Sequence, residues 1–315
     1  MNHNTVLVTG CAGFVGNSLI RLLLSKKYNV VGLDNFHKMS SGAMLEVIHD
    51  TNFTFYEGDV RNEYLLENIL RKHNITQIVH LAAIVGAPSC KKNVYESYSV
   101  NVVGAQILNS LADSHIPIVF ASTGSVYGSV KDKMCTENTL CNPQSEYGQQ
   151  KLEAEEILSM ERDNTIVLRF ATGFGVDTPQ TRVNLLVNDL VYQAINNKSI
   201  TIFEADAWRT FIHVSDMSEA ILFFLQEGMN FSDRVYNVGC ESLNWTKRQL
   251  ANYIGEKTSC VVTFKDFDKD PDSRDYQVDY SRIHDKGWSP SKTMEQGIDD
   301  LIKAVPIMKI RHSYE

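Results

Sequence analysis

Short apolar runs alternate with amphipathic stretches through the first half of this chain. Six mostly apolar runs have the length and composition of buried strands: 6–8, 30–33, 53–56, 78–81, 118–121 and 166–168. Between them, apolar residues at helical spacing predict helices over 14–26, 63–72, 99–114 and 147–160. Strands that alternate with helices form parallel sheets with both faces covered. The pattern predicts an α/β fold, a Rossmann-type doubly wound parallel sheet.

Beyond residue 172 the predicted elements become shorter, and loops rich in Asp and Pro interrupt them. One later run, 235–238, again has the composition of a buried strand, so we expect the two parts of the chain to interleave. We therefore predict a Rossmann domain over 1–172, to which 207–240 returns. A smaller α/β lobe would consist of 173–206 and 241–315.

Composition narrows the class of protein. The chain has 315 residues, of which 43% are hydrophobic and 22% charged, which is typical of globular domains. Its net charge of -8 argues against binding to nucleic acid or to an anionic membrane. No signal peptide and no apolar run of about 20 residues is found, so we expect a cytoplasmic protein. None of the six cysteines has C-x-x-C or zinc-site spacing, so reduced thiols and no metal are expected.

A glycine-rich loop, TGCAGFVG at 9–16, follows the first predicted strand and opens the first helix. Gly10 allows a tight turn, Gly13 lets the backbone approach a pyrophosphate, and Gly16 permits close helix–strand packing. Asp34 ends the next strand, where its carboxylate can bind ribose hydroxyls and would repel a 2′-phosphate. A loop with purely structural glycines is the alternative. The strand–loop–helix context favours a dinucleotide site that prefers NAD to NADP.

A tyrosine and a lysine stand four positions apart in the helix predicted over 147–160, and therefore share one face. A phenol is a poor base at neutral pH, but a nearby ammonium lowers its pKa, so Tyr147 and Lys151 can act together on an alcohol. Thr123 follows the fifth strand, and the carboxyl ends of such strands bind ligands. Its hydroxyl could bridge a substrate oxygen and Tyr147. Surface residues and an ordinary turn are the alternatives, which the dinucleotide loop disfavours.

Taken in order, these motifs resemble the extended short-chain dehydrogenase/reductase family, in its nucleotide-sugar epimerase/dehydratase branch. The resemblance covers nearly the whole chain. The matching segments are TGxxGFxG at 9–16, Asp34, GDV at 58–60, HLAA at 80–83, Asn101-Val102, 122–128, YxxxK at 147–151, LRF at 168–170, RTFIHVSD at 209–216, GWSP at 287–290 and Gly297-Ile298.

The resemblance implies NAD as cofactor and a nucleotide-diphosphate sugar as substrate. Tyr147 would be the general acid/base and Lys151 would hold the nicotinamide ribose, with Thr123 as the third catalytic residue. Asp59 would hold the adenine amino group. The implied cofactor-binding residues are Gly10, Gly13, Phe14, Val15, Asp34, Asn35, Asp59, Val60, Leu81, Ala82, Ala83, Ser122, Tyr147 and Lys151. The implied substrate-binding residues are Val85, Gly86, Thr123, Thr172, Asn184, Arg209 and Arg274.

The two arginines, Arg209 and Arg274, would clamp the pyrophosphate of the sugar nucleotide, because planar guanidinium groups suit phosphate geometry. A surface ion pair is the alternative for Arg209. The family's 4,6-dehydratases carry an acidic pair after the catalytic Thr, whereas this chain has Gly124 and Ser125. Dehydration and the related decarboxylation are therefore disfavoured. Thr172 stands where the family often has Asn, which affects the substrate contacts.

Segments 81–88, 169–172, 183–189 and 270–276 are similar to those of capsule and surface-polysaccharide enzymes, which include 4-epimerases and GDP-heptose C4 dehydrogenases. The resemblance implies oxidation at sugar C4 through a 4-keto sugar, by an epimerase or a dehydrogenase, which use the same residues. A 4,6-dehydratase, a decarboxylase and a non-catalytic NAD-binding regulatory protein remain alternatives. A homodimer is implied, through a four-helix bundle formed by the helices over 99–114 and 147–160 and their symmetry mates.

Overall fold

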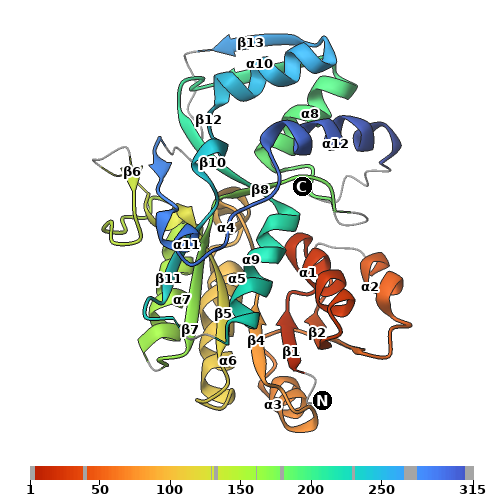
Figure 1. Ribbon diagram of the computed structural model, residues 1–315, viewed down its shortest axis with the longest axis vertical. Coiled ribbons are helices and arrows are strands. Elements are labelled where there is room, and N and C mark those ends of the chain that lie inside the picture. The colour runs from red at the N-terminus through yellow and green to blue at the C-terminus, as the bar shows by residue number, and fades with distance from the viewer. Residues whose placement is uncertain are drawn as a thin grey trace.

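The computed structural model describes residues 4–37, 41–128, 130, 134–160, 162–177, 181–228, 231–265 and 275–308. Figure 1 shows a larger lobe built around a sheet and a smaller lobe that contains α8, α10 and α12. The arrows of β1 and β2 point from the end that holds the N-terminus toward the smaller lobe. The carboxyl ends of these strands, where open parallel sheets bind ligands, therefore face that lobe.

The larger lobe has a seven-stranded sheet in the order β11-β7-β5-β4-β1-β2-β3, in which all neighbouring strands run parallel. The strands are β1 (Thr5–Thr9), β2 (Asn29–Asp34), β3 (Phe53–Glu57), β4 (Gln77–His80), β5 (Ile118–Thr123), β7 (Thr165–Phe170) and β11 (Val235–Val238). Their order reverses between β1 and β4, as in a doubly wound sheet. The predicted Rossmann-type α/β fold is confirmed.

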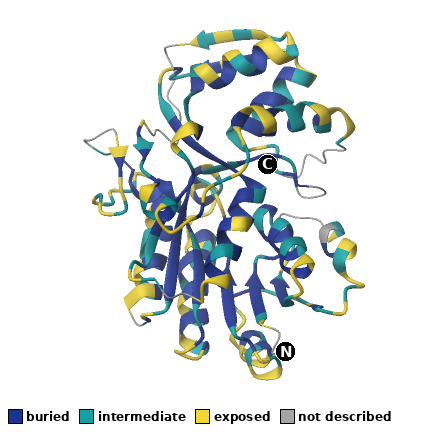
Figure 2. Ribbon diagram, viewed as in Figure 1, coloured by how far each residue is buried: buried dark blue, intermediate teal, exposed yellow. Residues whose placement is uncertain are grey.

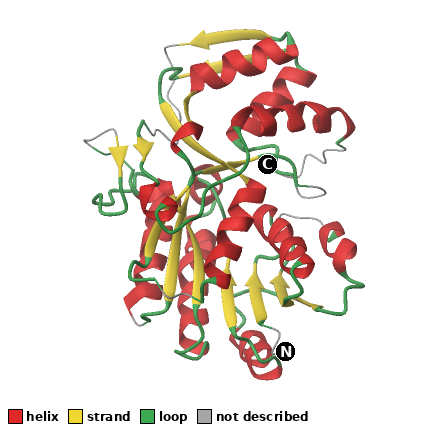
Figure 3. Cartoon of the chain, viewed as in Figure 1, coloured by secondary structure: helices red, strands yellow, loops and turns green. Residues whose placement is uncertain are grey.

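Helices cover both faces of this sheet (Figure 3). One face holds α1 (Phe14–Ser25) and α9 (Val214–Gln226), and the other holds α3 (Glu63–Lys72), α6 (Gly104–Leu111) and α7 (Glu146–Met160). Because strand side chains alternate, Val6 and Val8 enter the first core and Leu7 the second. Burial on both faces explains why the strands appear as continuous apolar runs, and Figure 2 shows them buried.

The helix predicted over 99–114 is confirmed as far as Leu111, but it contains a π-helical turn and ends three residues earlier than predicted. The chain forms α4 (Ala87–Lys92), α5 (Val94–Tyr98), a π-helical turn η1 (Ser99–Val103) and then α6, which ends at Leu111. Arg162, from beyond the end of α7, donates to the carbonyl oxygens of Asn109 at 3.0 Å and Asp113 at 2.8 Å. The N–H groups of this guanidinium replace the backbone donors that a longer helix would have offered to these carbonyl oxygens. The helix can therefore end at Leu111.

The smaller lobe contains short sheets and helices around a third apolar core. Its sheets pair β8 (Thr172–Phe174), β10 (Trp208–His213) and β12 (Asn244–Thr246), then β9 (Ser199–Phe203) with β13 (Val261–Lys265). Its helices are α8 (Leu186–Asn196), α10 (Lys247–Thr258) and α12 (Met294–Ala304). The remaining elements are α2 (Gly42–Val47), β6 (Met134–Cys135), β14 (Gln277–Val278), α11 (Ser281–His284) and the 3-10 turns η2 (Gly124–Val126), η3 (Glu241–Leu243) and η4 (Val305–Ile307).

The two parts of the chain interleave. Within 207–240, β11 joins the edge of the main sheet beside β7 and α9 packs on α1, whereas β10 pairs with β8 and β12. Asp216 in α9 accepts hydrogen bonds from the backbone N–H groups of Ser291 and Lys292 at 3.0 Å each. This carboxylate fixes the segment that leads into α12. In the described ranges, no helix is both long and apolar enough to cross a bilayer.

Candidate active site

Three loops meet at the carboxyl ends of neighbouring strands. The glycine loop follows β1, residues 81–86 follow β4, and Thr123 ends β5. In Gly10 the φ angle is +72°, and a Cβ there would lie 2.6 Å from the backbone nitrogen of Ala82. Only glycine therefore lets the first loop touch the second. Side-chain-free Gly13 is the N-cap of α1, so the first turn keeps backbone N–H groups available for an anion.

The Asp34 carboxylate supports this loop. Its Oδ2 accepts from the Ala12 N–H at 2.9 Å and its Oδ1 from the Phe36 N–H at 2.8 Å. Burial raises the pKa of Asp34, and these backbone N–H groups oppose that rise. An open glycine cradle at a helix N-terminus, followed by a fixed acidic group, fits a dinucleotide. Phe14 and Val15 open the helix beside this cradle.

Two neighbouring side chains fix the position of the Asp59 carboxylate. Arg61 donates to its Oδ1 from Nε at 2.8 Å, and Asn35 donates to its Oδ2 at 2.9 Å. The Arg61 hydrogen bond is the main cause that lowers the pKa of Asp59 to about 2, so the carboxylate stays ionised. Val60 beside it is buried. Sequence reasoning named Asp59, Val60 and Asn35 but missed Arg61, whose only signal was its place two residues after Asp59.

At the end of β5, Thr123 is largely buried, and its Oγ1 accepts from the backbone N–H of Ser125 at 3.2 Å. Gly148 explains how α7 approaches this turn. A Cβ on Gly148 would lie 2.7 Å from the Ser125 carbonyl oxygen, so the missing side chain lets the first turn of α7 contact it. Tyr147 is in this first turn and Lys151 follows one turn later. The structure thus brings the elements that carry Thr123, Tyr147 and Lys151 together.

Lys151 is buried, and its Nζ lies 3.9 Å from the centroid of the Phe120 ring. Burial lowers the pKa of Lys151 to about 7, and the Glu155 carboxylate acts in the opposite direction. Burial therefore makes the charged form of Lys151 less stable than that of an exposed lysine.

A buried ion pair connects α7 to the neighbouring strand β7. Arg169 Nη2 on β7 lies 2.7 Å from Glu155 Oε2, and both side chains are almost fully buried. Glu155 also accepts a hydrogen bond from the hydroxyl of Ser122, the neighbour of Thr123. One carboxylate thereby connects α7, β5 and β7. Sequence reasoning missed Glu155, although it follows Lys151 by four positions and so shares its helix face.

The residues predicted to bind the substrate are spread over several segments of the chain. Val85 and Gly86 lie after β4 with Leu81, Ala82 and Ala83, and Thr172 begins β8. Asn184 is exposed before α8 and accepts from Arg182 Nε at 3.2 Å. Arg209 on β10 is only 4% exposed, so it is no surface residue. Arg274 lies outside the described residues. Whether these side chains bind substrate stays a prediction.

Tyr276 was not foreseen. Its buried hydroxyl donates to the carbonyl oxygen of Gly124, the residue directly after Thr123. A Cβ on Gly124 would lie 3.5 Å from that hydroxyl oxygen, an ordinary contact. The tyrosine therefore lies over the position where 4,6-dehydratases carry the first of their acidic pair. No local sequence signal joins residues that are 152 positions apart.

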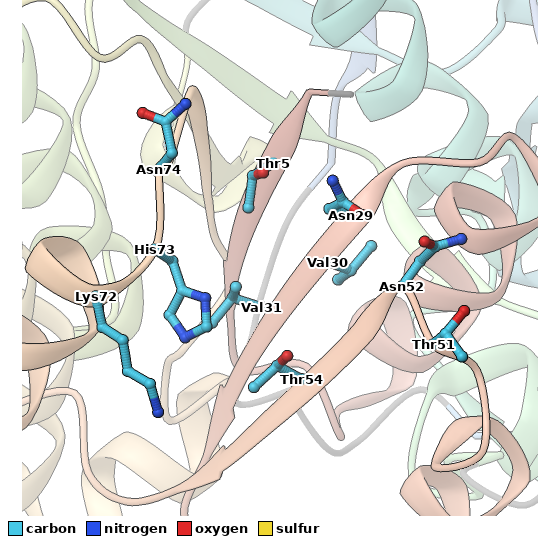
Figure 4. Close-up of a pocket in the computed structure, with 10 residues that line it drawn as sticks. All are labelled: Thr5, Asn29, Val30, Val31, Thr51, Asn52, Thr54, Lys72, His73 and Asn74. Carbon is cyan, nitrogen blue, oxygen red and sulfur yellow. The ribbon is translucent and has the colours of Figure 1, made fainter. Parts of the chain in front are cut away.

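A cavity of about 280 Å³ lies elsewhere, between the amino-terminal parts of β1, β2 and β3 and the end of α3 (Figure 4). Its lining is mostly polar and includes Asn29, Asn52 and His73. Ligands of open parallel sheets bind at the opposite, carboxyl ends of the strands. The glycine loop, Thr123 and α7 all lie at those ends, so we place the candidate active site there.

Comparison with known proteins agrees with this geometry. Residues 6–239 match the model of the NAD dependent epimerase/dehydratase family. The chain is 32% identical over 230 residues to an uncharacterised UDP-glucose epimerase, YtcB, of Bacillus subtilis (strain 168), covering 69% of this chain and 71% of that protein. It is 26% identical over 310 residues to a putative UDP-glucose 4-epimerase of Methanocaldococcus jannaschii, covering 94% and 97%.

Solved structures show the same architecture. The crystal structure of UDP-glucose 4-epimerase from Thermotoga maritima with UDP-glucose superposes with a TM-score of 0.83 at 25% identity, covering 96% of this chain and 99% of that chain. A dTDP-glucose 4,6-dehydratase from Bacillus anthracis in complex with NAD has a TM-score of 0.83 at 24% identity, covering 97% of both chains. At that identity the second similarity establishes the fold.

Proposed function

Because this chain belongs to the NAD dependent epimerase/dehydratase family, with NAD as its cofactor, we propose that it is a nucleotide-sugar 4-epimerase. It would oxidise the sugar at C4 and then reduce the opposite face of the resulting 4-keto sugar. The observation that carries this proposal is the contact between the first turn of α7, with Tyr147, and the turn after Thr123, in which no carboxylate follows the threonine. The relatives named as an uncharacterised UDP-glucose epimerase and a putative UDP-glucose 4-epimerase support it.

Bound NAD supplies a hydride acceptor and later a hydride donor. Tyr147 takes the proton from the sugar O4 and returns it after the keto group has been presented from its other side. Lys151 holds the nicotinamide ribose and biases Tyr147 toward phenolate when it is charged. Thr123 orients the O4 hydroxyl through a hydrogen bond. Asp34 would bind the adenosine ribose, so we expect tighter binding of NAD than of NADP.

Dehydration would need a further acid/base group. Removal of a C5 proton and loss of the 6-hydroxyl normally use a carboxylate near the catalytic threonine. Here Gly124 has no side chain, and Ser125 points its hydroxyl oxygen to within 3.2 Å of Thr123 Oγ1. Tyr276 occupies the neighbouring space. These contacts favour chemistry that stays at C4 and leaves the 6-hydroxyl in place.

UDP-glucose is the first substrate to test, because it is the sugar nucleotide in the names of both relatives. Arg209 supports a phosphate-bearing substrate, since its planar, permanently charged guanidinium group suits phosphate geometry. The resemblance of 81–88 to capsule enzymes suggests that the product feeds surface-polysaccharide synthesis.

The test is incubation of the full chain with NAD and UDP-glucose, then with GDP-, CDP- and dTDP-sugars, followed by NMR of the products. A C4 epimer that retains its 6-hydroxyl supports the proposal. Accumulation of NADH with a released 4-keto sugar would instead identify a C4 dehydrogenase of the GDP-heptose type, and a 6-deoxy-4-keto product a dehydratase. Absence of turnover with every sugar would favour a non-catalytic NAD-binding protein. Tyr147→Phe is the control for contaminating activity.

We also infer a homodimer formed through α5, α6 and α7. Tyr95 is 91% exposed and Tyr98 41% exposed on this side of the sheet, which leaves large apolar surface for a partner. Ile107 and Ile157 are half-buried, whereas Leu108 and Leu158 are fully buried in the core and cannot contribute. Light scattering at micromolar concentration should give twice the mass of the chain, and a monomer would refute the inference.

A further inference from the structure

Three side chains of metal-binding type meet beside the carboxyl end of β11. Cys240 and Glu241 lie in the turn after this strand, and His284 ends α11. One ligand atom of each residue lies within 4.8 Å of the other two. We propose that Cys240, Glu241 and His284, the Cys240 cluster, form a binding site for a divalent cation of the Zn²⁺ class.

The ligand types suit that cation. Zn²⁺ is bound by thiolate, imidazole and carboxylate groups at about 2.0–2.3 Å, commonly with three protein ligands and one open position. Glu241 Oε2 lies 3.7 Å from His284 Nδ1 and 4.0 Å from Cys240 Sγ. Ligands in a tetrahedral site of these bond lengths are about 3.3–3.7 Å apart. Small side-chain rotations would therefore close the cluster around an ion.

In His284 and Glu241, the side-chain atom that would not bind the cation already has a backbone partner. His284 Nε2 lies 3.3 Å from the carbonyl oxygen of Gly239, and Glu241 Oε1 accepts from the Tyr280 N–H at 2.9 Å. Ligating imidazoles usually donate their other N–H to a carbonyl or carboxylate, and ligating carboxylates are hydrogen-bonded in turn. If Nε2 carries the proton, the lone pair of Nδ1 is available next to Glu241 Oε2.

The backbone that carries these side chains is firmly packed. A Cβ on Gly239 would lie 2.6 Å from the ring of Tyr280, which is fully buried. The turn after β11 therefore lies directly on the residue that precedes α11. Cys240 and His284 are half-buried, whereas the Glu241 side chain is 48% exposed. A cation could thus enter from solvent and keep water as a fourth ligand.

An ion pair between Glu241 and His284 is the competing interpretation. In that case Cys240, whose Sγ lies 3.2 Å from the Ser242 hydroxyl oxygen, would take no part. Only the metal-site interpretation requires the Cys240 thiolate to bind a cation. A thiolate bound to Co²⁺ gives a charge-transfer absorption band, so this difference can be observed directly. The readout does not depend on sugar turnover.

The experiment is a Co²⁺ titration of the full chain with NAD bound and its thiols reduced. We expect one Co²⁺ per chain, a thiolate charge-transfer band, the visible bands of tetrahedral Co²⁺, and displacement by Zn²⁺. Cys240→Ala should abolish the charge-transfer band. His284→Gln should weaken binding by at least about tenfold, since even loss of an outer partner typically has an effect of about 10–100-fold.

Cys260→Ala is the matched control, because Cys260 is also half-buried but lies outside the cluster. It should bind Co²⁺ like the unaltered chain. Circular dichroism checks that each variant is folded, and Cys240→Ser, which can keep the contact with Ser242, replaces Cys240→Ala if that variant unfolds. No thiolate band at stoichiometric Co²⁺, or a band that persists in a folded Cys240 variant, would overturn the proposal.

Discussion

The hydroxyl of Tyr276 is bonded to the main-chain carbonyl of Gly124, next to the catalytic threonine of the proposed mechanism. This contact joins the turn after Thr123 to the segment that leads into β14. Tyr276→Phe removes the donor and leaves a buried carbonyl oxygen without it, so we expect a loss of about 1–3 kcal/mol in the free energy of unfolding. Urea denaturation measures this. Tyr64→Phe, at a residue of α3 that is 79% exposed, should leave stability unchanged.

Substitutions at the three positions of the proposed mechanism should separate chemistry from binding. Tyr147→Phe keeps the ring but removes the proton acceptor, so turnover should fall by at least about 10²–10⁴-fold while NAD binding survives. Lys151→Met should reduce turnover and also weaken NAD binding, because the lysine would serve both. Thr123→Val should have a smaller effect than Tyr147→Phe. Steady-state rates with the best sugar nucleotide and NAD titrations test these expectations, and full activity of Tyr147→Phe would contradict the mechanism.

Gly287 is a suitable control for Gly10 in the cofactor loop. Both have positive φ, +72° at Gly10 and +94° at Gly287, but only at Gly10 would a Cβ collide with neighbouring backbone. Gly287→Ala should reduce the free energy of unfolding by about 1–2 kcal/mol through backbone strain alone. Gly10→Ala should reduce it further and weaken NAD binding. Equal effects of the two variants on NAD affinity, measured by calorimetry, would show that the close approach to Ala82 is unimportant.

The ion pair between Glu155 and Arg169 should be important for stability, because removal of one partner leaves a buried charge uncompensated. We expect Glu155→Gln to reduce the free energy of unfolding by about 3–5 kcal/mol. Glu156→Gln, on the exposed side of the same helix, should change it by less than about 0.5 kcal/mol. Similar denaturation midpoints for the two variants would be evidence against this role.

His80 predicts how stability depends on pH. This histidine is fully buried, with Nδ1 2.7 Å from Thr9 Oγ1, and burial lowers its pKa from 6.5 to about 3. Between these values the unfolded chain binds a proton that the folded chain does not, so stability should fall as pH decreases from about 6.5 toward about 3. His80→Asn cannot titrate there, so its free energy of unfolding should fall less steeply. Parallel curves for the two proteins would refute this prediction.

The sequence predicts the fold well because both faces of the sheet are buried, which leaves apolar runs that differ from helical patterns. Tyr147 and Lys151 can be recognised because their relationship is local, one helical turn apart. Relationships between distant segments leave no such pattern. Arg162 ends α6 from outside that helix, Tyr276 reaches Gly124 across most of the chain, and His284 meets Cys240 only because α11 packs beside β11. These contacts depend on tertiary packing, which periodicity does not encode.

The position of β11 has a consequence for how the protein is made. This strand, Val235–Val238, pairs with β7 and completes the edge of a sheet whose other strands all come from the first 170 residues. During synthesis, one edge of β7 therefore stays unpaired until the segments between Phe170 and Val235 have been made. Unpaired edges invite intermolecular strand pairing. A gene truncated after residue 172 should accordingly yield a protein that aggregates rather than an isolated cofactor domain.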